Sequence, residues 1–263
     1  MSADLRPASS LEPADLASLF TRAYENYYVP VQVDEAALEY MARTFDLDPD
    51  AGLVAFEDEE PVGLVNLGVR GERGWIGGLG VVAEARRKGL GRTLMGAVHE
   101  QARARGMREI SLEVIEANEP AFRLYEDLGY EFLRWLEIGS LEGSAGEAPA
   151  EVDWRAAHEH IRSQRTGREP WQRDDETLLR YDDLRGLDLE TGAAVYRVIG
   201  DGRVILMQFA GDGQAARETL RSLRSLGPVS IFNVPEGDPL LAALEDLGGG
   251  IALRQREMLL SLQ

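Results

Sequence analysis

The sequence contains no cysteine among its 263 residues. That absence excludes disulfide bonds, zinc–thiolate sites, iron–sulfur clusters and a cysteine nucleophile. No apolar run approaches the roughly 18 residues that a membrane-spanning helix needs. The opening stretch MSADLRPASS has neither the basic region nor the apolar core of a secretory signal. We therefore expect a cytoplasmic protein with no membrane-embedded segment.

Positive charge is also scarce, because 28 Lys and Arg stand against 46 Asp and Glu, a formal net charge of −18. A surface that follows nucleic-acid phosphates needs clustered lysine and arginine, so we expect no nucleic-acid partner. An acidic surface can attract a cationic substrate, but solubility is the more general explanation. The hydrophobic share of 44% and the charged share of 28% are typical of a globular chain. They exclude a wholly disordered, fibrous or coiled-coil protein.

Histidine is rare as well, with three residues in the chain. His158 and His160 are two positions apart, so on a helix they point in different directions and chelate a metal poorly. We expect both at the surface and predict no metal site.

A segment rich in glycine, alanine, serine and glutamate, Gly139–Asp153, indicates a linker between two domains, 1–140 and 152–263. In the first domain, helical and strand periodicities alternate, which predicts an α/β fold with a mixed sheet between helices. The predicted helices there are 13–24, 34–41, 89–105 and 119–128, and the predicted strands are 53–56, 62–69, 75–82, 110–115 and 130–138.

The second domain repeats part of this order. A helical stretch over 154–181 precedes strands at 194–199 and 203–209, a helix at 215–226, a strand at 229–234, a helix at 239–247 and a strand at 251–262. The segment PLLAALEDLGG from Pro239 is similar to PAFRLYEDLGY from Pro120. The strands that follow are also similar, with LRQRE after the Pro239 segment and LRWLE after the Pro120 segment. This order favours duplication of one fold. The alternative is two unrelated amphipathic helices that both end in Leu-Gly.

The most informative segment is Arg86–Arg92, RRKGLGR, which follows an apolar strand and opens a helix. Glycines let the backbone approach a ligand closely, and the first amides of a helix are unpaired and lie at its positive end. The pattern predicts an anion site suited to pyrophosphate. A P-loop signature is absent, and the glycines of Gly78–Gly80 precede a strand rather than a helix, so a Rossmann fingerprint does not fit.

This segment, R-x-x-G-x-G after a strand that ends in valine, resembles the acetyl-CoA motif of the GNAT N-acetyltransferases. The resemblance implies that the strand backbone contacts the acyl group and the pantetheine arm, and that the loop amides hold the pyrophosphate. One departure is Ala83, where many members have proline. The cofactor-binding residues implied are Leu79, Gly80 and Val81 for the acyl end and Arg87, Lys88, Gly89, Leu90, Gly91 and Arg92 for the pyrophosphate.

The segment Leu112–Phe132 resembles the second GNAT signature, L-E-V-x-x-x-N followed by A-x-x-L-Y-x-x-L-G-[FY]. Asn118 is a helix cap by its chemistry, and the resemblance adds a cofactor contact. Tyr125 matches the tyrosine that protonates the departing thiolate, although it also fits a core aromatic on an apolar stripe. The resemblance covers about the first 138 residues.

Acetyl transfer needs a neutral amine, yet a free alkylammonium has a pKa near ~10. Glu113 lies inside an otherwise apolar strand, where a carboxylate is costly unless paired or functional. It is either the general base, directly or through water, or a strand-end carboxylate that pairs with arginine or faces solvent. Tyr24, Tyr27 and Tyr28 either line the acceptor pocket or pack in the core, and packing is the more general expectation.

The second domain lacks R-x-x-G-x-G and has Leu244 at the position that matches Tyr125. We therefore predict tandem GNAT-like folds, each a mixed, mostly antiparallel sheet flanked by helices, of which the second is degenerate. The chain would be a monomer with an internal pseudo-dimer, or a homodimer. Without cysteine, the expected activity is direct acetyl transfer from acetyl-CoA to a small-molecule amine or a protein amino group in a ternary complex. The alternative is a non-catalytic acyl-CoA-binding sensor or interaction module.

Overall fold

The computed structural model describes residues 4–146 and 148–262. The chain forms two compact units: unit 1 contains Met1–Leu133 and Glu257–Gln263, and unit 2 contains Arg134–Arg256. These bounds differ from the ranges 1–140 and 152–263 expected from the sequence. The strand that precedes the expected linker continues to Leu141, and the final strand contributes its last residues to unit 1. Residue 147 of the expected linker lies outside the described residues.

Unit 1 is a mixed sheet in the order β1-β2-β3-β4-β5, with the last part of β11 next to β5. β1 to β4 pair antiparallel in sequence order, and β4 and β5 pair in parallel. The strands are β1 (Asp4–Pro7), β2 (Leu53–Glu57), β3 (Glu60–Arg70), β4 (Arg73–Val81), β5 (Glu109–Ile115) and β11 (Gly250–Ser261).

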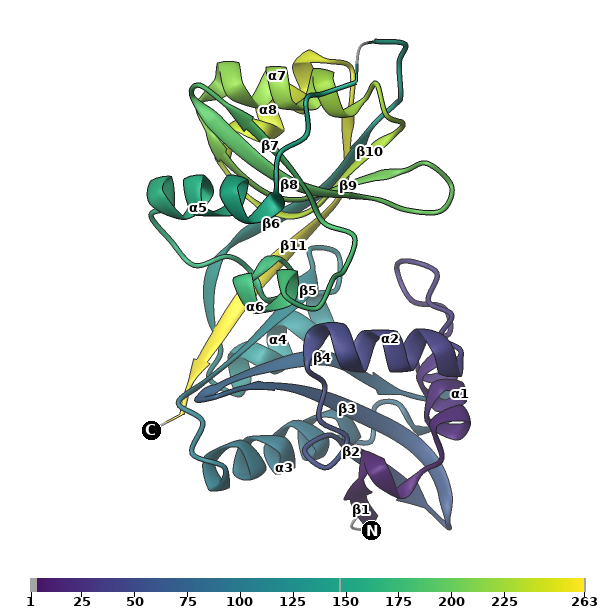
Figure 1. Cartoon of the computed structure of the whole chain (residues 1–263). Helices are drawn as coiled ribbons and strands as arrows, with labels where there is room; N and C mark the ends of the chain where they lie inside the picture. The colour runs from purple at the N-terminus through teal and green to yellow at the C-terminus, as the bar shows by residue number, and fades with distance from the viewer. Residues whose placement is uncertain (1–3, 147, 263) are drawn as a thin grey trace. The chain divides into compact units, whose positions relative to one another are not determined.

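Helices cover both faces of the unit 1 sheet, with α1 and α2 on one face and α3 on the other (Figure 1). The amphipathic helix α3 buries Leu94 and Val98 in the same hydrophobic core as the strand residues Ile110 and Leu112, and all four are almost fully buried. Asp34 caps α2 by accepting from the Ala37 amide at 2.8 Å, as its position before an apolar repeat predicts. The helical elements are η1 (Ala8–Ser10), α1 (Pro13–Ala23), α2 (Glu35–Phe45), η2 (Ala83–Ala85), α3 (Leu90–Ala104) and α4 (Glu119–Asp127).

Unit 2 repeats this plan, with strands in the order β6-β10-β9-β8-β7. β9 and β10 pair in parallel, as β4 and β5 do, and the other strand pairs are antiparallel. Its elements are β6 (Glu131–Leu141), α5 (Trp154–Gln164), η3 (Trp171–Arg173), α6 (Asp175–Leu178), β7 (Arg185–Leu189), β8 (Gly192–Val198), β9 (Val204–Gly211), α7 (Gly213–Leu223), β10 (Val229–Pro235) and α8 (Pro239–Asp246).

The expected helical stretch over 154–181 is broken into α5, η3 and α6. Gly167 and Pro170 interrupt it, since glycine is a weak helix former and proline disfavours helical geometry in the residue before it. Two short strands, β1 and β7, were not predicted, because their segments, DLRP and RGLDL, contain no β-branched or aromatic residue.

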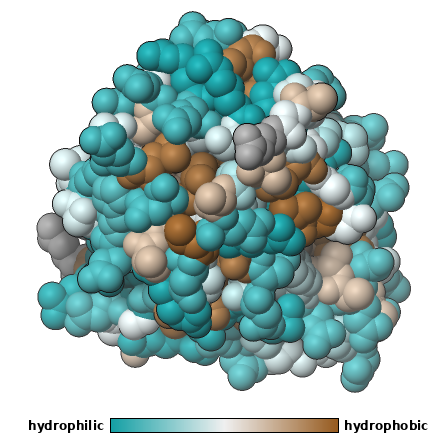
Figure 2. Space-filling model, turned by 45° about the horizontal axis from the view of Figure 1, so that its top comes forward, coloured by the Kyte–Doolittle hydropathy of each residue, from teal (hydrophilic) through white to brown (hydrophobic). Residues whose placement is uncertain are grey.

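Hydrophilic side chains predominate on the face seen in Figure 2, and apolar ones form smaller groups between them. Across residues 4–146 and 148–262, no helix has both the length and the apolar character needed to span a bilayer.

Candidate functional site

The strands β4 and β5 pair over a short distance and then separate. Their register joins Arg73–Trp75 to Glu109–Ser111, whereas β4 continues to Val81 with β3 as its partner. The Val82 amide donates to Val62 of β3 at 2.9 Å. Because amide directions alternate along a strand, the Leu79 and Val81 amides point away from β3 and the Gly80 amide points toward it. Of the three predicted acyl contacts, Leu79 and Val81 thus present donors where the strands separate.

The residues predicted to hold pyrophosphate surround the N-terminus of α3. A hollow of about 320 Å³ there is lined by Val81, Arg87, Gly89, Leu90, Gly91 and Arg92 of the predicted set and by Ala85, Arg86, Pro120 and Leu124. Gly89 directly precedes the helix with φ of +81°, and a side chain there would point into open space. Unpaired helix amides, glycine and basic residues fit a pyrophosphate at this place.

The basic residues of this loop have different roles. The Arg86 guanidinium donates to the carbonyls of Val81, Ala23 and Glu25 at 2.9–3.1 Å, so it fastens the end of α1 to β4. Lys88 pairs with Glu57 at 3.0 Å and Arg92 with Asp127 at 2.6 Å, both at the surface. Exposed pairs are weak, so an anion can recruit either cation.

Tyr125 lies almost fully buried in α4, with its ring edge-on to that of Tyr130 at 5.7 Å between centroids. The Tyr130 hydroxyl is 3.0 Å from Nε2 of His99 on α3. Burial raises the pKa of Tyr125 above its usual value near 10. The phenol therefore holds its proton at neutral pH, as a proton donor must.

Asn118 joins the helix cap to the tyrosines of the α1 end. Its Oδ1 accepts from the Ala121 amide at 3.3 Å, and its Nδ2 donates to the Tyr27 hydroxyl at 3.4 Å. The Tyr27 ring is edge-on to Tyr24 at 5.0 Å, whereas Tyr28 is half exposed. Tyr24 and Tyr27 thus belong to the same cluster of side chains as Asn118.

Glu113 has a partner that sequence analysis missed. Its Oε2 accepts from the Trp75 indole N–H at 2.8 Å, and the Trp75 ring is edge-on to Phe45 of α2. Glu113 is half-buried. The structure gathers Tyr125, Asn118, Tyr24 and Tyr27 around the separated strands and holds Glu113 through Trp75. Only the pairing of β4 with β5 reveals that contact, since the two residues are far apart in sequence.

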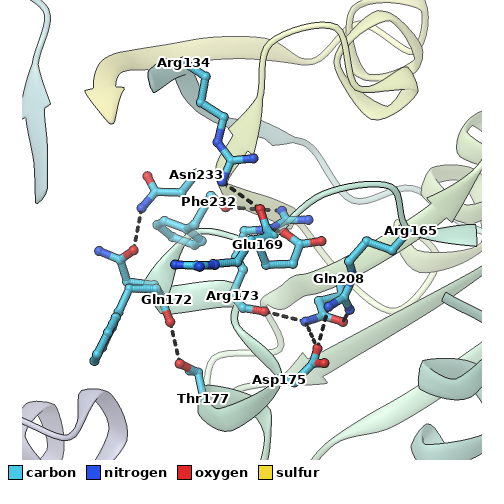
Figure 3. A network of polar contacts seen from close by, with 12 residues as sticks. Arg134, Arg165, Glu169, Gln172, Arg173, Asp175, Thr177, Gln208, Phe232 and Asn233 are labelled. Carbon is cyan, nitrogen blue, oxygen red and sulfur yellow. Dashed lines mark hydrogen bonds and ion pairs between the residues drawn. The ribbon is translucent and has the colours of Figure 1, made fainter. Parts of the chain in front are cut away.

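The corresponding places in unit 2 are filled by the chain itself. At the start of α7, the Asp212 carboxylate accepts from the amides of Gln214 and Ala215, both at 2.9 Å. A carboxylate therefore already occupies the anion position of this helix. Where β9 and β10 separate, Arg173 is buried, with its Nη1 3.3 Å from the Phe232 carbonyl (Figure 3).

The two histidines of α5 have separate partners. His158 contacts Asp175 at 2.9 Å and His160 contacts Asp188 at 2.6 Å. In the part of the chain that the structure describes, no group of three or more histidine, aspartate or glutamate side chains could hold a metal ion.

Comparison with known proteins agrees with this geometry. Residues 14–130 match the Acetyltransferase (GNAT) family. An acetyltransferase of Pectobacterium atrosepticum is 36% identical over 97 residues, which cover 37% of this chain and 69% of that protein.

Solved structures resemble the whole chain. A GCN5-related N-acetyltransferase from Sphaerobacter thermophilus has a TM-score of 0.72 at 16% identity, over 99% of this chain and 96% of that one. A tandem GNAT protein from the clavulanic acid biosynthesis pathway has a TM-score of 0.63 at 14% identity, over 100% of this chain and 99% of that one. These likenesses confirm the predicted fold class of two GNAT-like folds in tandem.

Proposed function

The chain belongs to the GNAT acetyltransferase family, whose members transfer the acetyl group of acetyl-CoA to amines, and we propose that unit 1 performs this reaction on a primary amine by direct attack in a ternary complex. The observation that carries the proposal is the hollow at the N-terminus of α3. It opens beside Val81 at the end of β4, between the predicted pyrophosphate loop and α4, which carries Tyr125.

Acetyl-CoA supplies a thioester, and the residues of unit 1 supply the rest. Val81 offers its amide on the edge of β4 that faces away from β3, where it polarises the acetyl carbonyl. Glu113 takes the proton that the ammonium group must lose, directly or through water. Tyr125 gives its proton to the sulfur as the carbon–sulfur bond breaks.

Unit 2 is proposed to be non-catalytic. Asp212 occupies its helix N-terminus, Arg173 fills its strand gap, and Leu244 replaces the tyrosine. One acetyl-CoA site per chain follows from this arrangement.

Titration calorimetry with acetyl-CoA tests the donor site, with a stoichiometry of one expected. An amine screen follows, with small cationic amines and peptides that have a free N-terminus, and a thiol reagent detects released CoA without background from protein cysteine. Tyr125→Phe should lower kcat by about 10²–10⁴-fold, the usual contribution of a general acid, and leave the Kd of acetyl-CoA unchanged.

Two other outcomes would change the assignment. Two binding sites per chain would refute a degenerate unit 2. Binding without CoA release for any amine would favour the alternative of an acyl-CoA-binding module.

A further inference from the structure

The rings of Phe20 in α1 and of Tyr24, which directly follows α1, lie on the backbone of β4. Phe20 and Tyr24 stack with centroids 4.8 Å apart. A Cβ at Gly80 would lie 3.1 Å from the Tyr24 ring, and a Cβ at Gly78 would lie 3.1 Å from the Tyr24 hydroxyl oxygen. The glycine-rich run of β4 therefore makes room for this tyrosine on the strand.

The Tyr24 hydroxyl occupies a defined place on β4. The Leu79 backbone N–H, which points away from β3, donates to the Tyr24 oxygen. Because that oxygen accepts from Leu79, its own proton is directed away from the strand amide. The hydroxyl therefore lies at the Leu79 amide, on the edge of β4 where the acetyl carbonyl is proposed to bind.

The surroundings keep this hydroxyl protonated. Burial raises the pKa of Tyr24 far above its usual value near 10, and the neighbouring phenols Tyr125 and Tyr27 add to the rise. A phenol that keeps its proton, and whose oxygen accepts a hydrogen bond, is a strengthened donor.

We propose that Tyr24 is a second catalytic tyrosine, whose O–H donates a hydrogen bond to the acetyl carbonyl oxygen and relays the polarisation of the Leu79 amide. The inference rests on the proposed function. As the amine nitrogen bonds to the carbonyl carbon, the carbonyl π pair moves to oxygen, and Tyr24 stabilises that charge while it keeps its proton. The pair then returns, the carbon–sulfur bond breaks and the sulfur takes the Tyr125 proton. The nitrogen gives its remaining extra proton to water, because Glu113 already holds the proton that the ammonium group lost.

Tyr24→Phe is the decisive variant, because it keeps the ring on Gly78 and Gly80 and removes only the hydroxyl. The carbonyl stretch of bound acetyl-CoA, labelled with ¹³C at the carbonyl carbon, is measured by infrared difference spectroscopy. We expect the band of the wild-type complex below that of free acetyl-CoA and a return toward the free value in the variant. The kcat should fall by about 10²–10³-fold, the usual cost of one lost donor to the carbonyl oxygen, with the Kd of acetyl-CoA unchanged.

Tyr40→Phe is the matched control, since Tyr40 of α2 is 39% exposed, is not among the residues assigned to the site, and should change neither the band nor kcat. A band identical in wild type and Tyr24→Phe would overturn this inference and leave the proposed function standing. If the wild-type chain fails to bind acetyl-CoA, the proposed function fails, and this inference fails with it.

Discussion

Arg173 offers a sharp test of how unit 2 is held together. Its side chain is 2% exposed, and its Nε is 2.9 Å from Oε2 of Glu169, which is 11% exposed. Asp238, the cap of α8, is close enough for the positive charge of Arg173 to lower its pKa, against a larger rise caused by burial. Arg173→Met preserves much of the volume and removes the charge that these two carboxylates share.

The expected cost is large because a buried charge would lose its partner. Breaking a buried ion pair from one side costs about 3–5 kcal/mol, and neither partner is exposed enough for water to reduce that figure much. Replacing both residues, Arg173→Met with Glu169→Leu, removes the lone charge and should recover most of the loss. A double-mutant cycle then gives the coupling energy.

Urea unfolding followed by tryptophan fluorescence measures the effect, because Trp135, Trp154 and Trp171 lie in unit 2. With an m-value of about 1–3 kcal/mol/M, the midpoint of the single variant should fall by roughly 1 M or more. A loss below about 1 kcal/mol, or a double variant as unstable as the single one, would refute the reasoning.

Three further predictions concern stability. Burial lowers the pKa of His99 from 6.5 to about 4, so protonation of His99 opposes folding. The free energy of unfolding should therefore fall as the pH drops from 6.5 toward 4. Urea melts at several pH values measure this fall, and His99→Gln should make it smaller. Hydrogen bonds from His158, Gln208 and Arg165 hold the pKa of Asp175 well below its usual value despite burial. The Asp175 carboxylate therefore contributes fully to the free energy of unfolding above about pH 4, and this contribution is lost progressively as the pH falls below that value. The difference in the free energy of unfolding between wild type and Asp175→Asn should narrow as acid is added. Gly89→Ala should lower the free energy of unfolding by about 1–2 kcal/mol, because the positive φ of Gly89 strains any residue with a Cβ. Gly96→Ala is the opposite case, since a Cβ there meets nothing within 4 Å and alanine favours the helix, and it should raise the melting temperature.

Much of unit 1 was predictable because its signals are local. A capping aspartate and an apolar repeat each act within a few residues, so α2 and α3 follow from short segments. The loop of glycines and basic residues before α3 is equally local, and the structure has a hollow there, whose binding of an anion stays a prediction. Asn118 was identified as a cap for the same reason, and it caps α4 in the structure.

The features that escaped prediction depend on register and burial. Trp75 meets Glu113 only because β4 and β5 pair in parallel next to them. Likewise, an arginine between charged and polar neighbours suggests a solvated residue, and nothing in the local sequence indicates that Arg173 is buried. Such contacts join segments whose proximity is set by the whole sheet.

The division of β11 between the units has a consequence for the order of synthesis. Met258, Leu260 and Leu262 are buried in the unit 1 core, and the Leu262 amide donates to the Arg108 carbonyl at 2.7 Å. A ribosome that has finished residue 133 must still make all of unit 2, for roughly 6–25 s at 5–20 residues per second, before these residues exist. Throughout that interval the free side of β5 is an open edge, so nascent unit 1 is exposed to capture of the same strand from another copy.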